Sequence, residues 1–172
     1  MTLVNFEFKV RCSNIEQCER RLKVFNPHYV GEDRQTDTYF KIPDGRLKLR
    51  EGNIENALIY YKRADLADAK KSDVILYHSA EPSILKSLLE AAHGIKVVVN
   101  KIRRIYFIDN VKFHFDIVDQ LGSFVEVEAI DQDGTRGMET LLQQCDAYAK
   151  ILQLKKEDFE SRSYSDMILS GR

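Results

Sequence analysis

The strongest constraint on the fold is a strict alternation of polar and apolar residues near the start of the chain. Residues 4–12 read V-N-F-E-F-K-V-R-C, so that Asn5, Glu7 and Lys9 alternate with apolar residues. Successive side chains of a β-strand point to opposite faces of the sheet. The segment therefore predicts a strand with one apolar face and one face that carries both signs of charge.

The same alternation returns in several later segments. They are R-L-K-L-R (46–50), Y-Y-K-R (60–63), K-I-R (101–103), H-F-D (114–116) and E-V-E (126–128). If the charged faces pointed outward, the apolar faces would fill the interior of an ordinary small barrel. If they pointed inward, the buried charges would need partners, a metal or a ligand to offset the cost of desolvation. The pattern alone leaves both orientations open and makes the outward one the simpler reading.

Helix signals separate these strands. Ser13 and Glu16 predict a capping box and a helix that Pro27 closes. A second helix is expected from near Pro82 to Gly94, and a third through residues 138–152. The expected strands are 4–12, 36–42, 46–51, 57–63, 73–79, 97–108, 111–119 and 123–130. Residues 1–172 are thus expected to form one α+β domain, an eight-stranded antiparallel β-barrel or strongly curled sheet with helices packed outside.

Composition and net charge limit the kinds of molecule with which the protein is expected to associate. The formal net charge is −1, which argues against a bulk electrostatic partner such as nucleic acid. No apolar run approaches the roughly 18–20 residues of a membrane-spanning helix, and the first residues lack the pattern of a signal peptide. The 3 cysteines form no C-x-x-C pair, so that reduced thiols in a cytoplasmic protein are expected. The oligomeric state is open, with a homodimer as one alternative.

An inward orientation would bring acids and cations together. Its acids would be Glu7, Asp116, Glu126 and Glu128, beside a comparable group of lysines and arginines. Carboxylate oxygens are the ligands that Mg²⁺ and Mn²⁺ prefer, whereas Lys and Arg bind phosphate oxygens. Such a face suits a metal-bound polyphosphate.

In this order, the segments resemble the CYTH superfamily of triphosphate tunnel metalloenzymes, and most of all its class IV adenylyl cyclase-like branch. The motifs are D-R-Q-T-D-T-Y-F (33–40), P-D-G-R-L-K-L-R-E (43–51), Y-Y-K-R-A-D (60–65), K-I-R-R-I-Y (101–106) and H-F-D-I-V-D-Q-L-G-S-F-V-E-V-E (114–128). The family opens with E-x-E-x-K. Here Glu7 and Lys9 match, but Asn5 replaces the first acid.

The resemblance implies an eight-stranded tunnel with charged walls. Carried over by position, it implies that the divalent metal, Mg²⁺ or Mn²⁺, is held by Glu7, Glu126 and Glu128. It implies that the triphosphate is bound by Lys9, Lys48, Arg50, Lys62, Lys101 and Arg103. Asp116 would assist the metal or orient the attacking group, and Lys62 is also a candidate catalytic residue. Arg63 and Arg104 are out of phase with these cations and are expected to face outward. Asn5 puts a second metal position in doubt.

The resemblance leaves the reaction open. A class IV cyclase converts ATP to cyclic AMP and pyrophosphate, whereas a triphosphatase hydrolyses the terminal phosphate of tripolyphosphate or thiamine triphosphate. Both need the same cations and metal, and no pocket for a base is evident in the sequence. A non-catalytic polyphosphate or nucleotide sensor is a third alternative, which the Asn5 replacement makes reasonable. His114 is in phase with Asp116 and is expected either to line the tunnel or to form structural hydrogen bonds.

Overall fold

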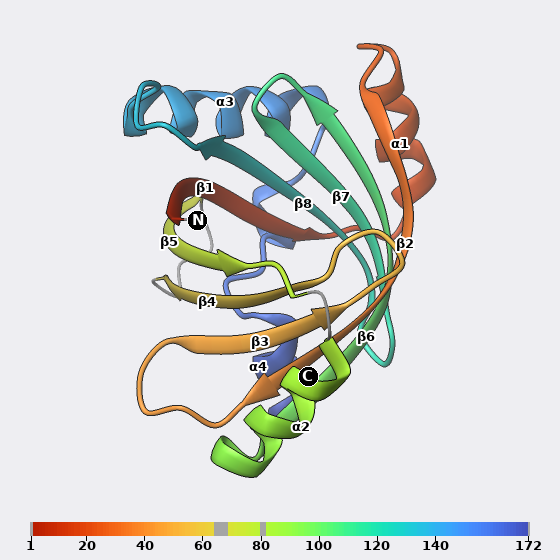
Figure 1. The fold of residues 1–172 in the computed structure, drawn as a ribbon. Helices are drawn as coiled ribbons and strands as arrows, with labels where there is room; N and C mark the ends of the chain where they lie inside the picture. Colours follow the sequence, from red (N-terminus) through yellow and green to blue (C-terminus); the bar gives the residue numbers. More distant parts are fainter. Residues whose placement is uncertain (1, 64–68, 80–81, 172) are drawn as a thin grey trace.

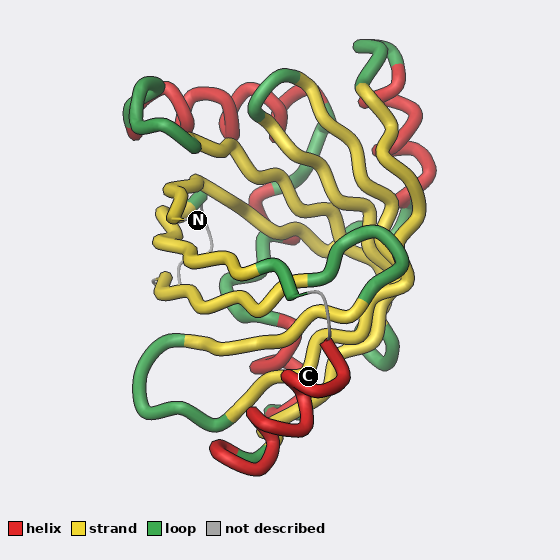
Figure 2. The backbone as a smooth tube through the Cα atoms, viewed as in Figure 1, coloured by secondary structure: helices red, strands yellow, loops and turns green. Residues whose placement is uncertain are grey.

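Eight strands form one closed antiparallel ring (Figures 1 and 2). The computed structural model describes residues 2–63, 69–79 and 82–171. The strands are β1 (Thr2–Arg11), β2 (His28–Phe40), β3 (Arg46–Glu51), β4 (Ala57–Arg63), β5 (Lys70–Tyr77), β6 (Ile95–Ile108), β7 (Val111–Val118) and β8 (Gly122–Asp131). Their order around the ring is β1-β5-β4-β3-β2-β6-β7-β8, with β8 returning to β1. The predicted α+β architecture with eight antiparallel strands is confirmed.

The helices lie outside this ring. They are α1 (Ile15–Lys23), α2 (Pro82–His93), α3 (Met138–Ile151) and α4 (Tyr164–Leu169), with a short 3-10 turn η1 (Lys156–Asp158) before α4. In Figure 1, α3 crosses the ends of β1 and β8 and α2 packs on β2 and β3, while α4 contacts β6. Among the described residues, none of these helices has the length and apolar character needed to span a membrane.

The main hydrophobic core lies between the outer face of the sheet and the helices. Phe8, Phe113 and Val127 point out from β1, β7 and β8 and pack against Leu22 of α1 and Leu141 of α3. All five side chains are buried. Because these apolar faces are covered by helices, the alternating charged faces of the same strands point into the ring. The inward orientation, the costlier of the two that the pattern allowed, is the one that the chain adopts.

The boundaries of several elements differ from the sequence prediction. Strand β2 begins at His28, well before the predicted start at residue 36, because its polar residues Asp33 and Gln35 are buried and pair with β6 instead of forming a loop. The side chain of Asn14 caps α1 by accepting from the Gln17 amide, so the predicted capping box of Ser13 and Glu16 is wrong. The sequence did not predict η1 or α4.

Candidate functional site

The ring encloses a cavity of about 410 Å³ that is lined by charged side chains along most of its circumference. We call this part the charged wall. It consists of Glu7 and Lys9 on β1, Lys48 and Arg50 on β3, Lys101 and Arg103 on β6, Lys112 and His114 on β7, and Glu126 and Glu128 on β8. Each strand contributes alternate residues, as the pleat requires. The prediction that the charged residues share one face of their strand is therefore confirmed for β1, β3, β6, β7 and β8.

Three cations of the charged wall converge on one buried carboxylate, Asp37 of β2. Arg50 binds it through two nitrogens at 2.9 Å, Lys48 lies at 3.0 Å and Lys101 at 2.7 Å. Burial alone would raise the pKa of Asp37, but Arg50, Lys101 and Lys48 hold it well below its usual range. Burial lowers the pKa of Lys101 to about 7, with Arg50 and Arg103 adding repulsion. One anion thus orders three cations, and their positive charge is incompletely neutralised.

A second buried carboxylate, Asp116 of β7, fixes Arg103. The Nε of Arg103 lies 2.7 Å from Asp116 Oδ1, and the hydroxyl of Tyr164 donates to Oδ2 at 2.7 Å. Arg103 also reaches Glu126 Oε2 at 2.8 Å. The ammonium group of Lys9 lies over the ring of Tyr164, 4.0 Å from the ring centroid. Asp116 and Tyr164 therefore hold cations in place, and Asp116 does not line the cavity.

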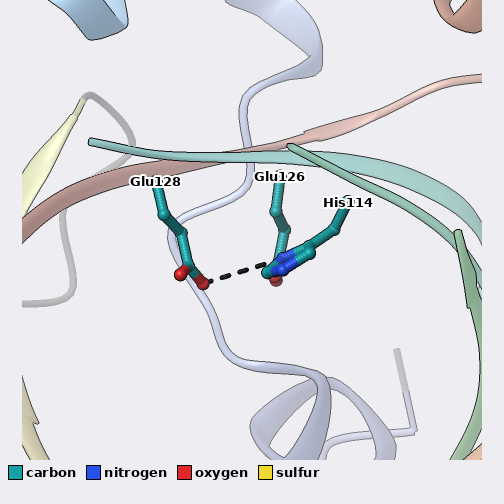
Figure 3. Close-up of side chains that lie close together, drawn as sticks. All are labelled: His114, Glu126 and Glu128. Carbon is teal, nitrogen blue, oxygen red and sulfur yellow. Dashed lines mark hydrogen bonds and ion pairs between the residues drawn. The ribbon is translucent and has the colours of Figure 1, made fainter. Parts of the chain in front are cut away.

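Next to Lys9 and Arg103, three side chains of β7 and β8 form a group that could hold a metal ion (Figure 3). One ligand atom each from His114, Glu126 and Glu128 lies within 4.8 Å of the others. The Nδ1 of His114 is 3.3 Å from Glu126 Oε2 and 3.7 Å from Glu128 Oε1. Glu7 lines the same cavity directly across from Glu128 in the β1–β8 register, but it does not belong to this group.

The charge state of this group fits a divalent cation. Burial, with the neighbouring carboxylates Glu7 and Glu126, raises the pKa of Glu128 to about 7 against the opposing effect of Lys112. Burial and the nearby Arg103 lower the pKa of His114 to about 3, which keeps the imidazole neutral and able to bind a metal. A divalent ion would relieve the repulsion between the carboxylates. The buried Oδ1 of Asn5 lines the same cavity and has no hydrogen-bond partner in the described part of the chain.

The remaining side of the cavity is apolar. We call it the apolar wall, formed by Ala57, Ile59 and Tyr61 of β4 with Val74 and Leu76 of β5. Most of the residues of β4 and β5 are apolar on both faces, and those that point inward include no charged side chain among the described residues that line the cavity. The cavity thus has two unlike sides, one suited to phosphate and metal and the other to an uncharged organic group.

Eight of the nine residues expected to bind the metal or the triphosphate come together in the cavity, and Lys62 does not. Lys62 is exposed on the outer side of β4 and pairs there with Asp44 in a separate hollow. Its neighbour Tyr61 takes the inward position, so the predicted tunnel position of Lys62 is wrong. The expectation that Asp116 meets the metal is also wrong in geometry, because Arg103 and Tyr164 occupy its oxygens.

The two predicted outward arginines have different outcomes. Arg104 lies outside the ring, where it pairs with Glu19 of α1 at 3.1 Å, as expected. The side chain of Arg63 lies outside the described residues.

The sequence analysis missed four contributors to the site. Lys112 is in phase with His114 and could have been found by extending the H-F-D alternation backward. Asp37 lies in the predicted strand 36–42, but its role in ordering the cations was not predicted. Glu55 reaches Arg50 at 2.9 Å and pairs with Lys112 from the β3–β4 connection, where the amides of Ile54 and Glu55 bind Asp33. The fourth is Tyr164. No local pattern signals the contribution of a loop or of the C-terminal segment.

Comparison with known proteins places this geometry in a family. The family model described as CYTH domain matches residues 4–164. None of the curated proteins compared with the chain matches it. Among solved structures, the PH1012 protein from Pyrococcus horikoshii is 25% identical with a TM-score of 0.80, over 94% of this chain and 98% of that one.

Two further structures share the fold at lower identity. A Vibrio parahaemolyticus protein, provisionally assigned as an adenylate cyclase, is 22% identical with a TM-score of 0.76, over 96% of this chain and 97% of that one. The HpAC1 protein from Hippeastrum, assigned provisionally as an adenylyl cyclase and showing a dominant triphosphatase activity, is 12% identical with a TM-score of 0.67, over 99% and 96% of the two chains.

Proposed function

The chain belongs to the CYTH domain family, and on this basis we propose that it is a metal-dependent enzyme that acts on a nucleoside or organic triphosphate, most like a class IV adenylyl cyclase. The observation that carries the proposal is the pairing of two charge groups in one closed cavity. Lysines and arginines ordered by Asp37 and Asp116 face a group of carboxylates on β1 and β8.

The cations are proposed to bind the phosphates. Lys9, Lys48, Lys101, Arg50 and Arg103 approach the cavity from three strands, β1, β3 and β6, so that they can contact several phosphate oxygens at once. Lysine and arginine form charge-assisted hydrogen bonds with phosphate oxygens, and an arginine can bind two of these oxygens at once. The same cations would stabilise the negative charge that develops on a leaving pyrophosphate or phosphate. Asp116 is proposed to orient Arg103, since Arg103 and Tyr164 donate to its two oxygens.

The carboxylates are proposed to hold Mg²⁺ or Mn²⁺. Glu126 and Glu128 would supply oxygen ligands, with Glu7 close by on the neighbouring strand. When bound, such an ion polarises phosphoryl oxygens and offsets their charge. Glu126 also accepts from Arg103 and pairs with Lys9 at 3.2 Å, so it links the metal side of the site to the phosphate side.

The apolar wall supports an organic triphosphate over bare tripolyphosphate. A ribose and base, or a thiazolium and pyrimidine, could lie against Ile59, Tyr61 and Val74 while the phosphates lie on the charged wall. In a cyclase, the ribose 3′-hydroxyl then attacks the α-phosphorus and pyrophosphate leaves. In a hydrolase, water attacks the γ-phosphorus. The charged wall serves both reactions.

Product identification tests the proposal. The full chain is incubated with ATP, thiamine triphosphate or tripolyphosphate, each with Mg²⁺ or with Mn²⁺, beside the Glu126→Gln variant as a control for contaminating activity. Cyclic AMP and pyrophosphate from ATP support the cyclase. Orthophosphate instead identifies a triphosphatase. Binding without turnover of any of the three substrates would overturn the enzymatic proposal in favour of a sensor.

A further inference from the structure

We propose that His114 is a direct ligand of the bound cation, together with Glu126 and Glu128, and that this nitrogen makes the site prefer Mn²⁺ to Mg²⁺. The inference rests on the metal-dependent function proposed above and goes beyond it, because the motif resemblance assigns the metal only to glutamates.

The distances between the three side chains are compatible with binding of one metal ion. Neighbouring ligands of a six-coordinate ion, each at about 2.1 Å from the metal, lie about 3 Å apart. The Nδ1 of His114 is 3.3 Å from Glu126 Oε2 and 3.7 Å from Glu128 Oε1. Small movements of these side chains would therefore place one ion in contact with all three. Figure 3 shows the imidazole and both carboxylates converging from adjacent strands.

The hydrogen bonding of His114 does not explain why an imidazole is buried here. The side chain is 1% exposed, and its Nε2 has no hydrogen-bond partner within the described part of the chain. A buried polar atom normally has a partner, and a purely structural histidine would satisfy both nitrogens. The Nδ1 of His114 faces two carboxylates, as a ligand that shares a metal ion with them would, and no hydrogen bond to Nε2 within the described part of the chain fixes the ring in another role.

The first strand explains why a nitrogen would matter in this chain. Asn5 stands where the family motif has an acid, so β1 offers the metal side one carboxylate, Glu7, instead of two. The group that the ring brings together is two carboxylates and an imidazole. Mg²⁺ prefers oxygen ligands, whereas Mn²⁺ also accepts imidazole and binds such mixed sets more tightly.

Electron paramagnetic resonance of Mn²⁺ bound to the full chain tests the assignment. The electron spin-echo envelope should show coupling to the ¹⁴N of a coordinated imidazole in the wild type. The coupling should disappear in His114→Gln and persist in His78→Gln. His78 is the matched control because it lines the same cavity and contacts Asn56 instead of the acidic group.

Affinity gives an independent readout. In titrations, His114→Gln should weaken Mn²⁺ binding at least about tenfold, the lower end expected for groups around a metal, while Mg²⁺ binding changes far less. Circular dichroism and thermal unfolding of the variant establish that it is folded. If it is not, the ¹⁴N coupling of the wild type against His78→Gln still decides the question. An absent ¹⁴N coupling, or equal losses for both metals, would overturn the proposal and make His114 a hydrogen-bonding neighbour of the ligands.

The two proposals fail in different ways. Nitrogen coordination of Mn²⁺ without turnover of any triphosphate would support the metal assignment and overturn the enzymatic function. Metal-dependent turnover with oxygen ligands alone would support the enzymatic function and overturn the metal assignment of His114.

Discussion

Both walls of the cavity are formed by strands whose side chains point alternately inward and outward. The inward side chains are charged on one wall and apolar on the other. On β1, β3, β6, β7 and β8 the inward face is charged and the outward face apolar, whereas on β4 and β5 the inward face is apolar. On β5 the outward face carries Lys71 and Asp73, which are paired at 3.0 Å. The sheet reverses its polarity partway around the ring. Alternation therefore identifies a strand but not the side that faces inward.

This difference separates two tasks within one cavity. The charged wall is stabilised by its own ion pairs. The side chains of the apolar wall need no hydrogen-bond or ion-pair partner. We expect changes in the charged wall to affect every substrate and changes in the apolar wall to discriminate between substrates.

The largest effect is expected from Glu126→Gln. Gln keeps the shape of the side chain but removes the charge that faces Lys9, Arg103 and the metal group. We expect kcat/KM to fall at least about 100-fold for every triphosphate that the wild type uses, because metal binding and cation positioning both weaken. Glu16→Gln on the exposed side of α1 is the control. Wild-type turnover by Glu126→Gln at saturating Mg²⁺ and Mn²⁺ would mean that the metal lies elsewhere.

Lys48→Met should weaken triphosphate binding by about 1.5–3 kcal/mol, the scale of a charge-assisted hydrogen bond. This lysine is the cleanest cation to remove, because Asp37 keeps its contacts with Arg50 and Lys101. Calorimetric titration with a non-hydrolysable triphosphate measures the change. Lys62→Met is the matched control, since Lys62 lies on the outer side of β4. Equal losses in both variants would mean that the phosphate is not bound inside the ring.

The pH dependence of metal-free stability should depend on Glu128. Its folded pKa is about 7 and the ordinary value is 4.5, so the folded state binds the proton more tightly than the unfolded state does. This contribution is complete below about pH 4.5 and is lost as the pH rises through 7. Between pH 5 and 8 in chelator, Glu128→Gln should therefore gain about 1–3 kcal/mol of stability relative to the wild type. If the free energies of unfolding of the wild type and the variant differ by the same amount at pH 5 and at pH 8, the pKa of Glu128 is not raised in the folded state.

The smallest effect is expected from the apolar wall. Ile59→Ala removes apolar surface that would contact the organic part of a substrate, so KM for ATP or thiamine triphosphate should rise about three- to tenfold. KM for tripolyphosphate should not change. Ile75→Ala, which truncates an exposed side chain on the outer face of β5, is the control. A rise in KM for tripolyphosphate as well would remove the distinction between the walls.

The sequence was sufficient for the fold class and for most of the charged wall. Strict alternation identified the strand phase of Lys9, Arg50 and Glu126, and the order of the motifs gave the orientation. Lys62 was misplaced because β4 reads A-L-I-Y-Y-K-R, whose largely apolar sequence does not indicate which face points inward. No pattern within a single strand records that reversal.

The anions that order the cations escaped prediction for a different reason. Asp37 lies in the polar run E-D-R-Q-T-D, whose burial depends on cations from β3 and β6. Asp116 was recognised as an inward acid, but its pairing with Arg103 and Tyr164 depends on a segment about 50 residues farther along the chain. Pairings of this kind are set by tertiary structure, and local sequence contains no signal for them.

The closure of the ring through β1 has a consequence for how the protein folds. Strand β1 pairs with β5 on one side and with β8, residues 122–131, on the other. Contacts between segments so distant in the chain form slowly, so we expect the β1–β8 seam to join late in folding. Glu7 and Lys9 meet Glu128 and Glu126 across that seam. Until β8 pairs with β1, the strands therefore exist without a complete cavity, and the two sides of the candidate metal site have not yet come together.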